Sequence, residues 1–90
     1  MMIKRGDIYW AKLAEQKDSN VICKTRPVIV VSNNTANRFS PILSVVPITG
    51  QKKKTLPTHV EISGYGLPGT SIALIEQVIC IDKTNLLNGL

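Results

Sequence analysis

Short runs of β-branched and aliphatic residues, each ended by turn-forming residues, recur along the whole chain. They cover residues 7–13, 27–33, 41–49, 58–62 and 71–81, and the stretches between them are rich in Gly, Pro, Asn or Lys. Runs this short are typical of β-strands joined by turns. The pattern predicts a mostly β protein, a small and partly open curved barrel of five to seven strands with one or two short helices.

Two prolines fall inside apolar runs and restrict the pairing of those strands. Proline has no backbone N–H for a sheet ladder, so Pro27 is expected at the start of its strand. For the same reason Pro47 indicates an edge strand or a bulge within residues 41–49.

The expected helices are short. The stretch "NTANRF" (34–39) predicts one helical turn with Asn33 or Asn34 as its cap. The run 71–81 is consistent with one long strand or with two strands broken near Glu76. Asp82 is a suitable N-cap for a short helix over residues 83–90.

The length of 90 residues favours a single domain spanning 1–90. A chain of this size buries only about 60–65% of the surface that its unfolded form exposes, so we expect modest stability. Dimerisation would bury further apolar surface.

The chain is basic, with eleven Lys and Arg against six Asp and Glu and a net charge of +5. This balance suits a polyanion such as nucleic acid, but a merely basic soluble protein would have it too. Three consecutive lysines, Lys52, Lys53 and Lys54, stand in a loop, where they would contact phosphates or simply face solvent.

Cysteine and histidine are scarce. Cys23, Cys80 and His59 are too few and too scattered for a structural zinc site, so we expect no metal. Cys80 lies in the apolar run "QVICID" and is interpreted as a small core residue. Two cysteines make no disulfide framework, which indicates a reducing cytoplasm. The sequence shows neither a signal peptide nor a membrane span.

Common motifs for hydrolases, phosphate-binding loops and metalloproteases are missing from the sequence. His59 lies in the middle of an expected strand, and we interpret it as a structural or surface histidine.

Arg26 is constrained by the proline after it, because proline keeps the preceding residue extended. Its guanidinium offers five N–H donors in a fork that matches phosphate oxygens. An ion pair with Asp7, Glu61 or Glu76 is the alternative, and the local sequence slightly favours it.

Several segments together resemble the MazF/PemK family of toxin–antitoxin toxins. They are "KRGDIYWAKL", "RPVIVVSNNTANRFSP", "VPITGQ", "LPTHVEI" and "IEQVICIDKTNL". They follow the order of the family and cover nearly all of the chain outside residues 14–25.

The resemblance implies an SH3-like barrel, usually a homodimer, acting in the cytoplasm. It implies ribosome-independent, sequence-specific endoribonuclease activity, that of an mRNA interferase, on single-stranded RNA. In this reaction the ribose 2′-OH attacks the adjacent phosphate and no metal or cofactor takes part. Cleavage would inhibit translation, and a cognate antitoxin would neutralise the enzyme.

The resemblance also assigns site residues. Arg26, in the R-P-V motif, would stabilise charge on the phosphate, and Thr49 would hydrogen-bond the same phosphate. By its strand-end position alone, Thr49 is a capping residue of the turn into Gly50. The remaining candidates for RNA binding are Lys24, Asn33, Arg38, Gln51, Lys52, Lys53 and Lys54. The general base is left open among Glu15, Asp18, Glu61 and Glu76.

The sequence departs from the family in two places. The loop within residues 14–25 has no glycine, and the chain stops at "LLNGL", where family members commonly continue into a C-terminal helix. One alternative is therefore a weak relative that binds RNA or an antitoxin peptide without cleaving. A second is a poison of DNA gyrase, because a neighbouring toxin family shares this fold, although no motif here supports it.

Overall fold

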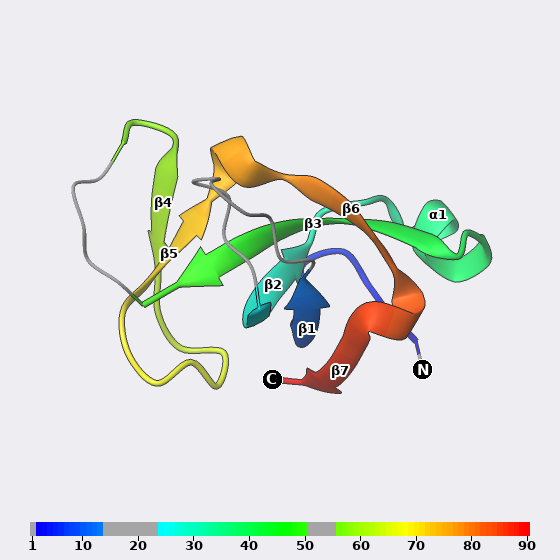
Figure 1. Ribbon diagram of the computed structural model, residues 1–90, viewed down its shortest axis with the longest axis horizontal. Helices are drawn as coiled ribbons and strands as arrows, with labels where there is room; N and C mark the ends of the chain where they lie inside the picture. The colour runs from blue at the N-terminus through cyan, green and yellow to red at the C-terminus, as the bar shows by residue number, and fades with distance from the viewer. Residues whose placement is uncertain (1, 14–23, 51–55) are drawn as a thin grey trace.

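The computed structural model describes residues 2–13, 24–50 and 56–90, which form a mostly β fold with short helical turns (Figure 1). The seven strands in this part of the chain lie at the upper end of the predicted range. In chain order the elements are β1 Ile8–Leu13, β2 Lys24–Val30, α1 Asn34–Phe39, β3 Ile42–Thr49, β4 His59–Ile62, β5 Ser71–Leu74, η1 Ile75–Gln77, β6 Ile79–Asp82, η2 Lys83–Asn85 and β7 Leu86–Gly89.

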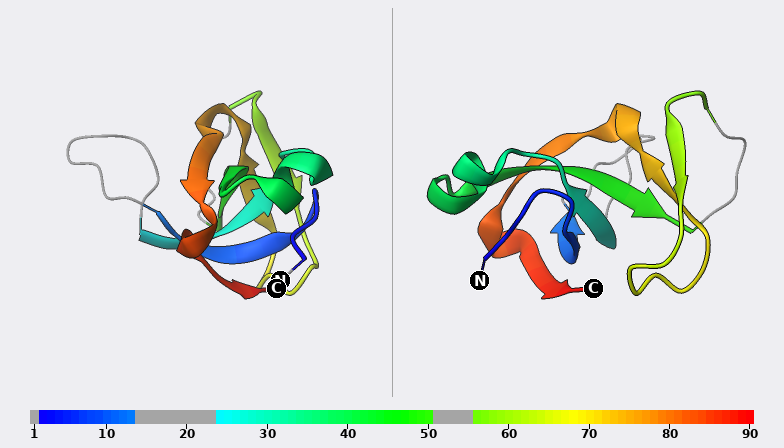
Figure 2. Two further views of the ribbon diagram at one scale, coloured as in Figure 1. Left: turned by 90° about the vertical axis from the view of Figure 1, so that its right-hand side faces the viewer. Right: turned by 180° about the vertical axis from the view of Figure 1, so that it is seen from behind.

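All strand pairs are antiparallel and follow the order β4-β5-β3-β2-β1-β7, with β6 as an additional partner of β3. The sheet is curved but does not close into a complete barrel, as the end-on view shows (Figure 2). Strand β3 is central because it pairs with β2 along one edge and with both β6 and β5 along the other.

Pro47 lies where the second edge of β3 changes partner. The β6 ladder ends at the Val45–Ile79 pair, and the β5 ladder begins at Ile48–Ala73. Ser44 O accepts a hydrogen bond from the N–H of Val31, the residue directly after β2, so the backbone of Ser44 faces β2. Because successive backbone groups alternate in direction, the backbone of Pro47 faces the other edge of β3. The missing N–H therefore falls in the gap between two ladders. The expected edge strand is wrong, since Pro47 is fully buried in a central strand.

Pro27 lies inside β2 rather than at its start, because the strand begins at Lys24. Its partner on β1 is Trp10. On the β3 side the ladder ends one residue later, at the Val28–Pro47 pair. The backbone of Pro27 faces β3, where the next ladder bond would need an N–H, so β2 continues toward Lys24 paired with β1 alone.

The core lies on both faces of the sheet. The inner face, around which the sheet curls, carries a cluster that includes Ala11, Val28 and Val45, and this cluster also contains Ile81 of β6 and Leu86 of β7. The outer face carries a second cluster formed by Ile8, Val46, Ile48 and Ala73. Residues on β1, β2 and β3 alternate between the two clusters, so these strands are buried on both sides.

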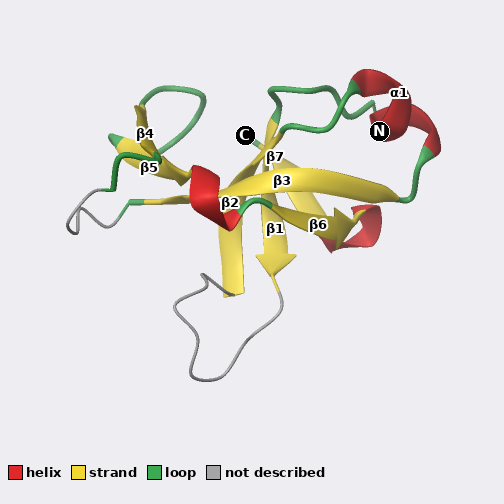
Figure 3. Ribbon diagram, turned by 90° about the horizontal axis from the view of Figure 1, so that it is seen from above, coloured by secondary structure: helices red, strands yellow, loops and turns green. Residues whose placement is uncertain are grey.

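The run 71–81 forms two strands separated by η1, which lies between β5 and β6 (Figure 3). The expectation for Cys80 is wrong: it is exposed, because Ile79 and Ile81 turn the other face of β6 inward. Asp82 does act as an N-cap, accepting a hydrogen bond from Thr84 N. The expectation of a short helix over residues 83–90 is wrong beyond residue 85, because residues 86–89 pair with β1 as β7 instead.

The helix α1 forms as expected, and Asn33 is its cap, with Oδ1 accepting from Ala36 N at 2.8 Å. Asn37 of α1 is buried, with 1% of its surface exposed. Its Nδ2 donates to Ser32 O at 2.9 Å, and its Oδ1 accepts from the Ser32 hydroxyl. Asn37 thus fixes α1 on the turn that leads into it.

Among the described helices, none has the length and apolar character needed to cross a membrane.

We predict that Asn37→Ala lowers the free energy of unfolding by about 1–3 kcal/mol, because it leaves buried polar groups of Ser32 without their partner. Thr35→Ala, on the exposed side of the same helix, is the matched control and should change it by no more than about 0.5 kcal/mol. Urea denaturation followed by circular dichroism measures both. Equal effects of the two substitutions would show that Asn37 has no special role.

Candidate functional site

Arg26 has a buried donor without a partner. It lies in β2 opposite Ala11 and is half-buried. Its Nε is buried and makes no hydrogen bond, the one such side-chain atom found among the described residues. A buried N–H that lacks an acceptor costs about 1–3 kcal/mol, so it points to an acceptor supplied from outside the chain.

The ion pair considered for Arg26 is not formed with the described carboxylates. Glu76 pairs with His59 instead. Asp7 accepts hydrogen bonds from Lys4 N and from the Tyr9 hydroxyl. The carboxylates of Glu76 and Asp7 are therefore bonded to groups other than Arg26.

Arg26 and Thr49 lie on the same face of the sheet. The ladder between β2 and β3 ends at the Val28–Pro47 pair. Arg26 lies two residues beyond Val28 on β2, and Thr49 lies two residues beyond Pro47 on β3. Since side chains alternate, both residues share the inner face with Val28 and Pro47. The register thus brings the two expected catalytic residues to the same end of the β2–β3 pair, beyond the end of the ladder.

The same face continues across β5 onto β4. Thr49 pairs with Ile72, and Ile72 pairs with Glu61, so these three side chains form one row. His59 lies two residues before Glu61 and opposite Leu74, which places it on this face as well. This band of the inner face therefore has polar side chains at both ends, with Arg26 and Thr49 at one end and those of β4 at the other, and buried apolar side chains of β5 between them.

His59, Thr58 and Glu76 form a hydrogen-bonded group at the β4 end of this band. His59 Nδ1 accepts from Leu56 N at 3.1 Å, so its proton lies on Nε2, which is 2.8 Å from Glu76 Oε2. The Thr58 hydroxyl donates to Glu76 Oε1 at 3.0 Å. Both oxygens of the carboxylate are thereby fixed, and η1 is joined to β4.

These contacts determine the ionisation of Glu76. Partial burial alone would raise the pKa of this carboxyl, but hydrogen bonds from His59, from its own backbone N–H and from Thr58 together lower the pKa below the ordinary 4.5. Glu76 is therefore an ionised and oriented carboxylate at neutral pH. Strand position alone gave no sign of its bond to His59, because the two residues are 17 positions apart.

The other expected RNA-binding residues lie in three places. Lys24 begins β2 with a positive φ of 69°, close to Arg26 along the chain. Asn33 and Arg38 belong to α1, which lies at the opposite end of β3 from Thr49 (Figure 1). The structure does not bring these two close to Arg26. Gln51, Lys52, Lys53 and Lys54 lie outside the described residues, as do the candidate bases Glu15 and Asp18.

The described side chains offer anion chemistry on this face. A guanidinium with an unused donor and a hydroxyl suit a phosphate group, and Glu61 and Glu76 supply negative charge further along the band. Within the described ranges, no three His, Cys, Asp or Glu side chains are grouped so as to hold a metal ion.

Comparison with known proteins gives consistent matches. The family described as "PemK-like, MazF-like toxin of type II toxin-antitoxin system" matches residues 4–89. Endoribonuclease EndoA of Bacillus subtilis (strain 168) is 46% identical over 89 residues, which are 96% of this chain and 76% of that protein. Endoribonuclease MazF of Staphylococcus saprophyticus is 42% identical over 88 residues, which are 94% of this chain and 72% of the relative.

A solved structure has a similar fold. An endoribonuclease in complex with its cognate antitoxin, from mycobacterial species, superimposes with a TM-score of 0.71 at 24% identity. The match covers 98% of this chain and 73% of the other.

We predict that the hydrogen bonds to Glu76 contribute stability that is lost in acid. The folded-state pKa is lowered, so the contribution is complete above the ordinary value of 4.5 and falls as pH drops through the folded pKa. Glu76→Gln should therefore flatten the fall of Tm between about pH 6 and pH 3. Glu61→Gln controls for the loss of one negative charge from the same region, and an equal flattening by both variants would contradict the prediction.

Proposed function

Because the chain belongs to the PemK-like, MazF-like toxin family of type II toxin–antitoxin systems, we propose that it is an endoribonuclease whose cleavage site lies at Arg26 and Thr49. It cleaves single-stranded RNA at particular sequences, independently of the ribosome, and so inhibits translation. A cognate antitoxin neutralises it. The substrate is unpaired because its bases must be splayed to be read one at a time.

The observation that carries this proposal is the buried, unpartnered Nε of Arg26. In the proposed reaction the ribose 2′-oxygen forms a bond to the adjacent phosphorus, and the bond from phosphorus to the 5′-oxygen breaks. The products are a 2′,3′-cyclic phosphate and a 5′-hydroxyl. Negative charge grows on the non-bridging oxygens, where the Arg26 guanidinium and the Thr49 hydroxyl donate hydrogen bonds.

The nucleophile belongs to the RNA, so the protein supplies orientation and charge stabilisation rather than a nucleophilic side chain. Arg26 is suited to the second task because its planar guanidinium offers several N–H donors in a fork that matches phosphate oxygens. The reaction requires no metal ion in this proposal.

The proton of the 2′-OH needs an acceptor, and we assign this role to Glu76 rather than Glu61. Glu76 is held by His59 and Thr58 in one orientation, whereas the structure gives Glu61 only a place on the same face. The lowered pKa keeps Glu76 ionised, which an acceptor requires, although it also makes Glu76 a weaker base.

We further propose that the protein acts as a homodimer in the cytoplasm, where its RNA substrate is found. A domain of this size leaves much apolar surface uncovered. Half-exposed side chains available for an interface include Leu56 at 50%, Val60 at 49% and Val78 at 52%. Lys24, Gln51, Lys52, Lys53 and Lys54 are proposed to contact RNA near the cleaved phosphate, and Asn33 and Arg38 to contact it further away.

We expect Arg26→Ala to lower kcat about 100- to 1,000-fold, because one set of donors to the developing charge is lost. Arg26→Lys keeps the charge but not the planar fork, so it should recover only a small part of this loss. Thr49→Val, which keeps the side-chain shape, should have a smaller effect of the same kind. The assay is cleavage of a long single-stranded RNA in the presence of EDTA, with the new 5′ ends mapped by sequencing.

Arg5→Ala is the matched control, because Arg5 is exposed on the turn before β1 and its known contact is made by the backbone N–H. Its kcat should equal that of the wild type. Intact RNA after incubation with folded wild-type protein would refute the endoribonuclease proposal. Full activity of folded Arg26→Ala would refute the assigned site.

For Glu76 we expect that Glu76→Gln lowers kcat by about 100- to 10,000-fold and removes the acidic limb of the pH–rate profile. Glu61→Gln should keep the wild-type kcat and the acidic limb of the pH–rate profile. Loss of the acidic limb in Glu61→Gln alone would transfer the role to Glu61, and an unchanged limb in both variants would exclude both residues as the base.

A further inference from the structure

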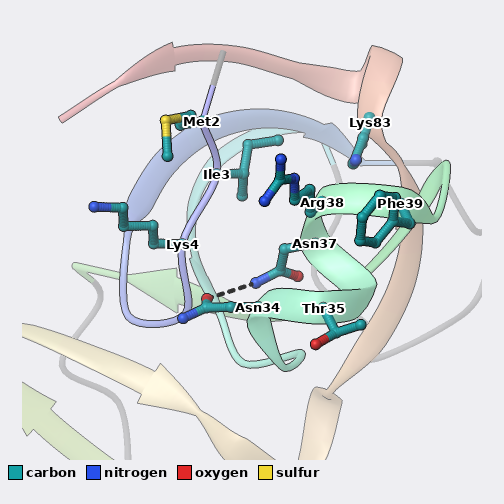
Figure 4. A pocket seen from close by; sticks show the side chains of 9 residues that line it. All are labelled: Met2, Ile3, Lys4, Asn34, Thr35, Asn37, Arg38, Phe39 and Lys83. Carbon is teal, nitrogen blue, oxygen red and sulfur yellow. Dashed lines mark hydrogen bonds between the residues drawn. The ribbon is translucent and has the colours of Figure 1, made fainter.

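A second site lies at the other end of β3. An open cavity of about 510 Å³ is bordered by the N-terminal segment, α1 and η2 (Figure 4). Its wall is formed by Met2, Ile3, Lys4, Asn34, Thr35, Asn37, Arg38, Phe39 and Lys83. None of the residues assigned above to the cleavage step lines it.

The charges of this cavity are all positive. Lys4, Arg38 and Lys83 come from three separate elements, and the wall contains no Asp or Glu. The salt bridge found in the described part of the chain, His59–Glu76, involves none of the three. Gathering like charges without a counter-charge is unfavourable, and a bound anion would relieve it.

The carboxylates that lie close along the chain are engaged elsewhere. Asp82, next to Lys83, accepts hydrogen bonds from the backbone N–H and the hydroxyl of Thr84, both at 2.9 Å. These bonds lower the pKa of Asp82 below its ordinary 3.8. Asp7 likewise accepts from Lys4 N. Neither carboxylate forms a salt bridge with Lys4, Arg38 or Lys83 in the described part of the chain.

The rim also carries a flat aromatic surface. Phe39 is 75% exposed, although a ring of this size is usually buried. The guanidinium carbon of Arg38 lies 5.4 Å from the centre of the ring. An exposed ring beside a guanidinium is the kind of surface on which unpaired bases stack.

Hydrogen bonds within the protein hold together the elements that form the cavity wall. Asn34 Oδ1 accepts from Arg5 N at 2.7 Å and from Asn37 Nδ2 at 3.4 Å, which joins the N-terminal segment to α1. Lys83 N donates to Pro41 O at 2.9 Å, which joins η2 to the segment after α1. A site whose walls are already ordered loses less entropy on binding.

We propose that this cavity is a distal RNA subsite: it binds the phosphate of a nucleotide outside the cleaved step through Lys4, Arg38 and Lys83, and the base stacks on Phe39. The subsite rests on the proposed endoribonuclease function. The seven residue steps of β3 span about 23 Å, so several nucleotides would connect the two sites. A small β-barrel domain commonly covers about 4–16 nucleotides of a single strand.

An acidic peptide is the competing ligand, since it would also meet the three cations. The exposed ring beside Arg38 favours RNA, because stacking needs a flat π surface and carboxylates do not. A peptide is therefore treated as an outcome of the test.

The test compares a short and a long RNA, both containing a cleavage sequence mapped beforehand. The short RNA contains only the nucleotides next to the cleaved bond, and the long RNA extends by about 12 nucleotides on each side, so that it exceeds the roughly 4–16 nucleotides that a small nucleic-acid-binding fold covers in total. Uncleavable versions carry a 2′-deoxyribose at the cleaved position. Binding is measured by fluorescence anisotropy and cleavage by steady-state kinetics, for the wild type, Arg38→Ala, Lys83→Ala and Phe39→Leu.

We expect Phe39→Leu to weaken binding of the long uncleavable RNA about 5-fold or more, and to raise KM for the long RNA without changing kcat. Arg38→Ala and Lys83→Ala should each reduce the slope of log Kd against log salt by about 0.7. All constants for the short RNA should stay those of the wild type. Arg5→Ala, outside the cavity wall, is the matched control.

Equal losses on the short and long RNA, or none on either, would overturn the subsite. So would a change of oligomeric state in sedimentation, or weaker binding of the cognate antitoxin with RNA binding intact, because the cavity would then serve a protein contact. Circular dichroism excludes misfolding, and Arg38→Lys provides a second variant if Arg38→Ala fails to fold. If the wild type cleaves no RNA, binding is measured with a long single-stranded RNA of mixed sequence instead; weaker binding by the variants would then support the subsite while the endoribonuclease proposal fails.

Discussion

The pairing of β3 with three strands is the constraint on which the rest of the structure depends. One edge of β3 pairs with β2, and the other is divided between β6 and β5. A regular strand would hold one partner along each edge. At Pro47 the second edge has no N–H to offer, so the ladder must end there and a different strand can begin. The division lets β6 curl toward the inner core while β5 and β4 extend the sheet in the other direction.

A second proline that lacks an N–H, Pro27, ends a ladder next to the candidate site. Pro27 ends the β2–β3 ladder just before Arg26 and Thr49, so the two strands are released from each other where both carry polar side chains on the inner face. Arg26 is still held by β1, through its pair with Ala11. The backbone of Arg26 is thus held by β1 and makes no ladder pair with β3. Its side-chain Nε is buried and has no hydrogen-bond partner.

The sequence predicted what depends on neighbouring residues. Strand positions and the family resemblance could be read from local patterns. The cap of α1 was narrowed to Asn33 or Asn34, and residues 71–81 to one strand or two strands broken near Glu76. What failed depended on tertiary pairing. Cys80 faces outward because register, rather than the length of an apolar run, decides which face of a strand is buried. Residues 86–89 form a strand because β1 offers a free edge, which no local propensity reveals.

The candidate site shows the same limit. Arg26 and Thr49 came from the resemblance, but their common face required the register of β2 and β3. The bond between His59 and Glu76 joins residues 17 positions apart, and a histidine inside a strand gives no indication of its partner. The distal cavity was still less accessible, because its three cations come from separate segments that meet only in the folded chain.

The distribution of charge gives the net charge of +5 its physical meaning. Asp7, Glu76 and Asp82 are three of the four carboxylates in the described ranges, and each accepts hydrogen bonds that hold a turn, a strand or a short helix in place. Among the described residues, none of these three carboxylates forms a salt bridge with a lysine or an arginine. Arg26 at one end of β3 and the cluster of Lys4, Arg38 and Lys83 at the other therefore keep their field for an outside partner. A flexible polyanion can satisfy both ends at once, and a compact anion cannot. The separation of the two positive regions along β3 therefore fits the proposed single-stranded RNA substrate, which carries a chain of phosphates.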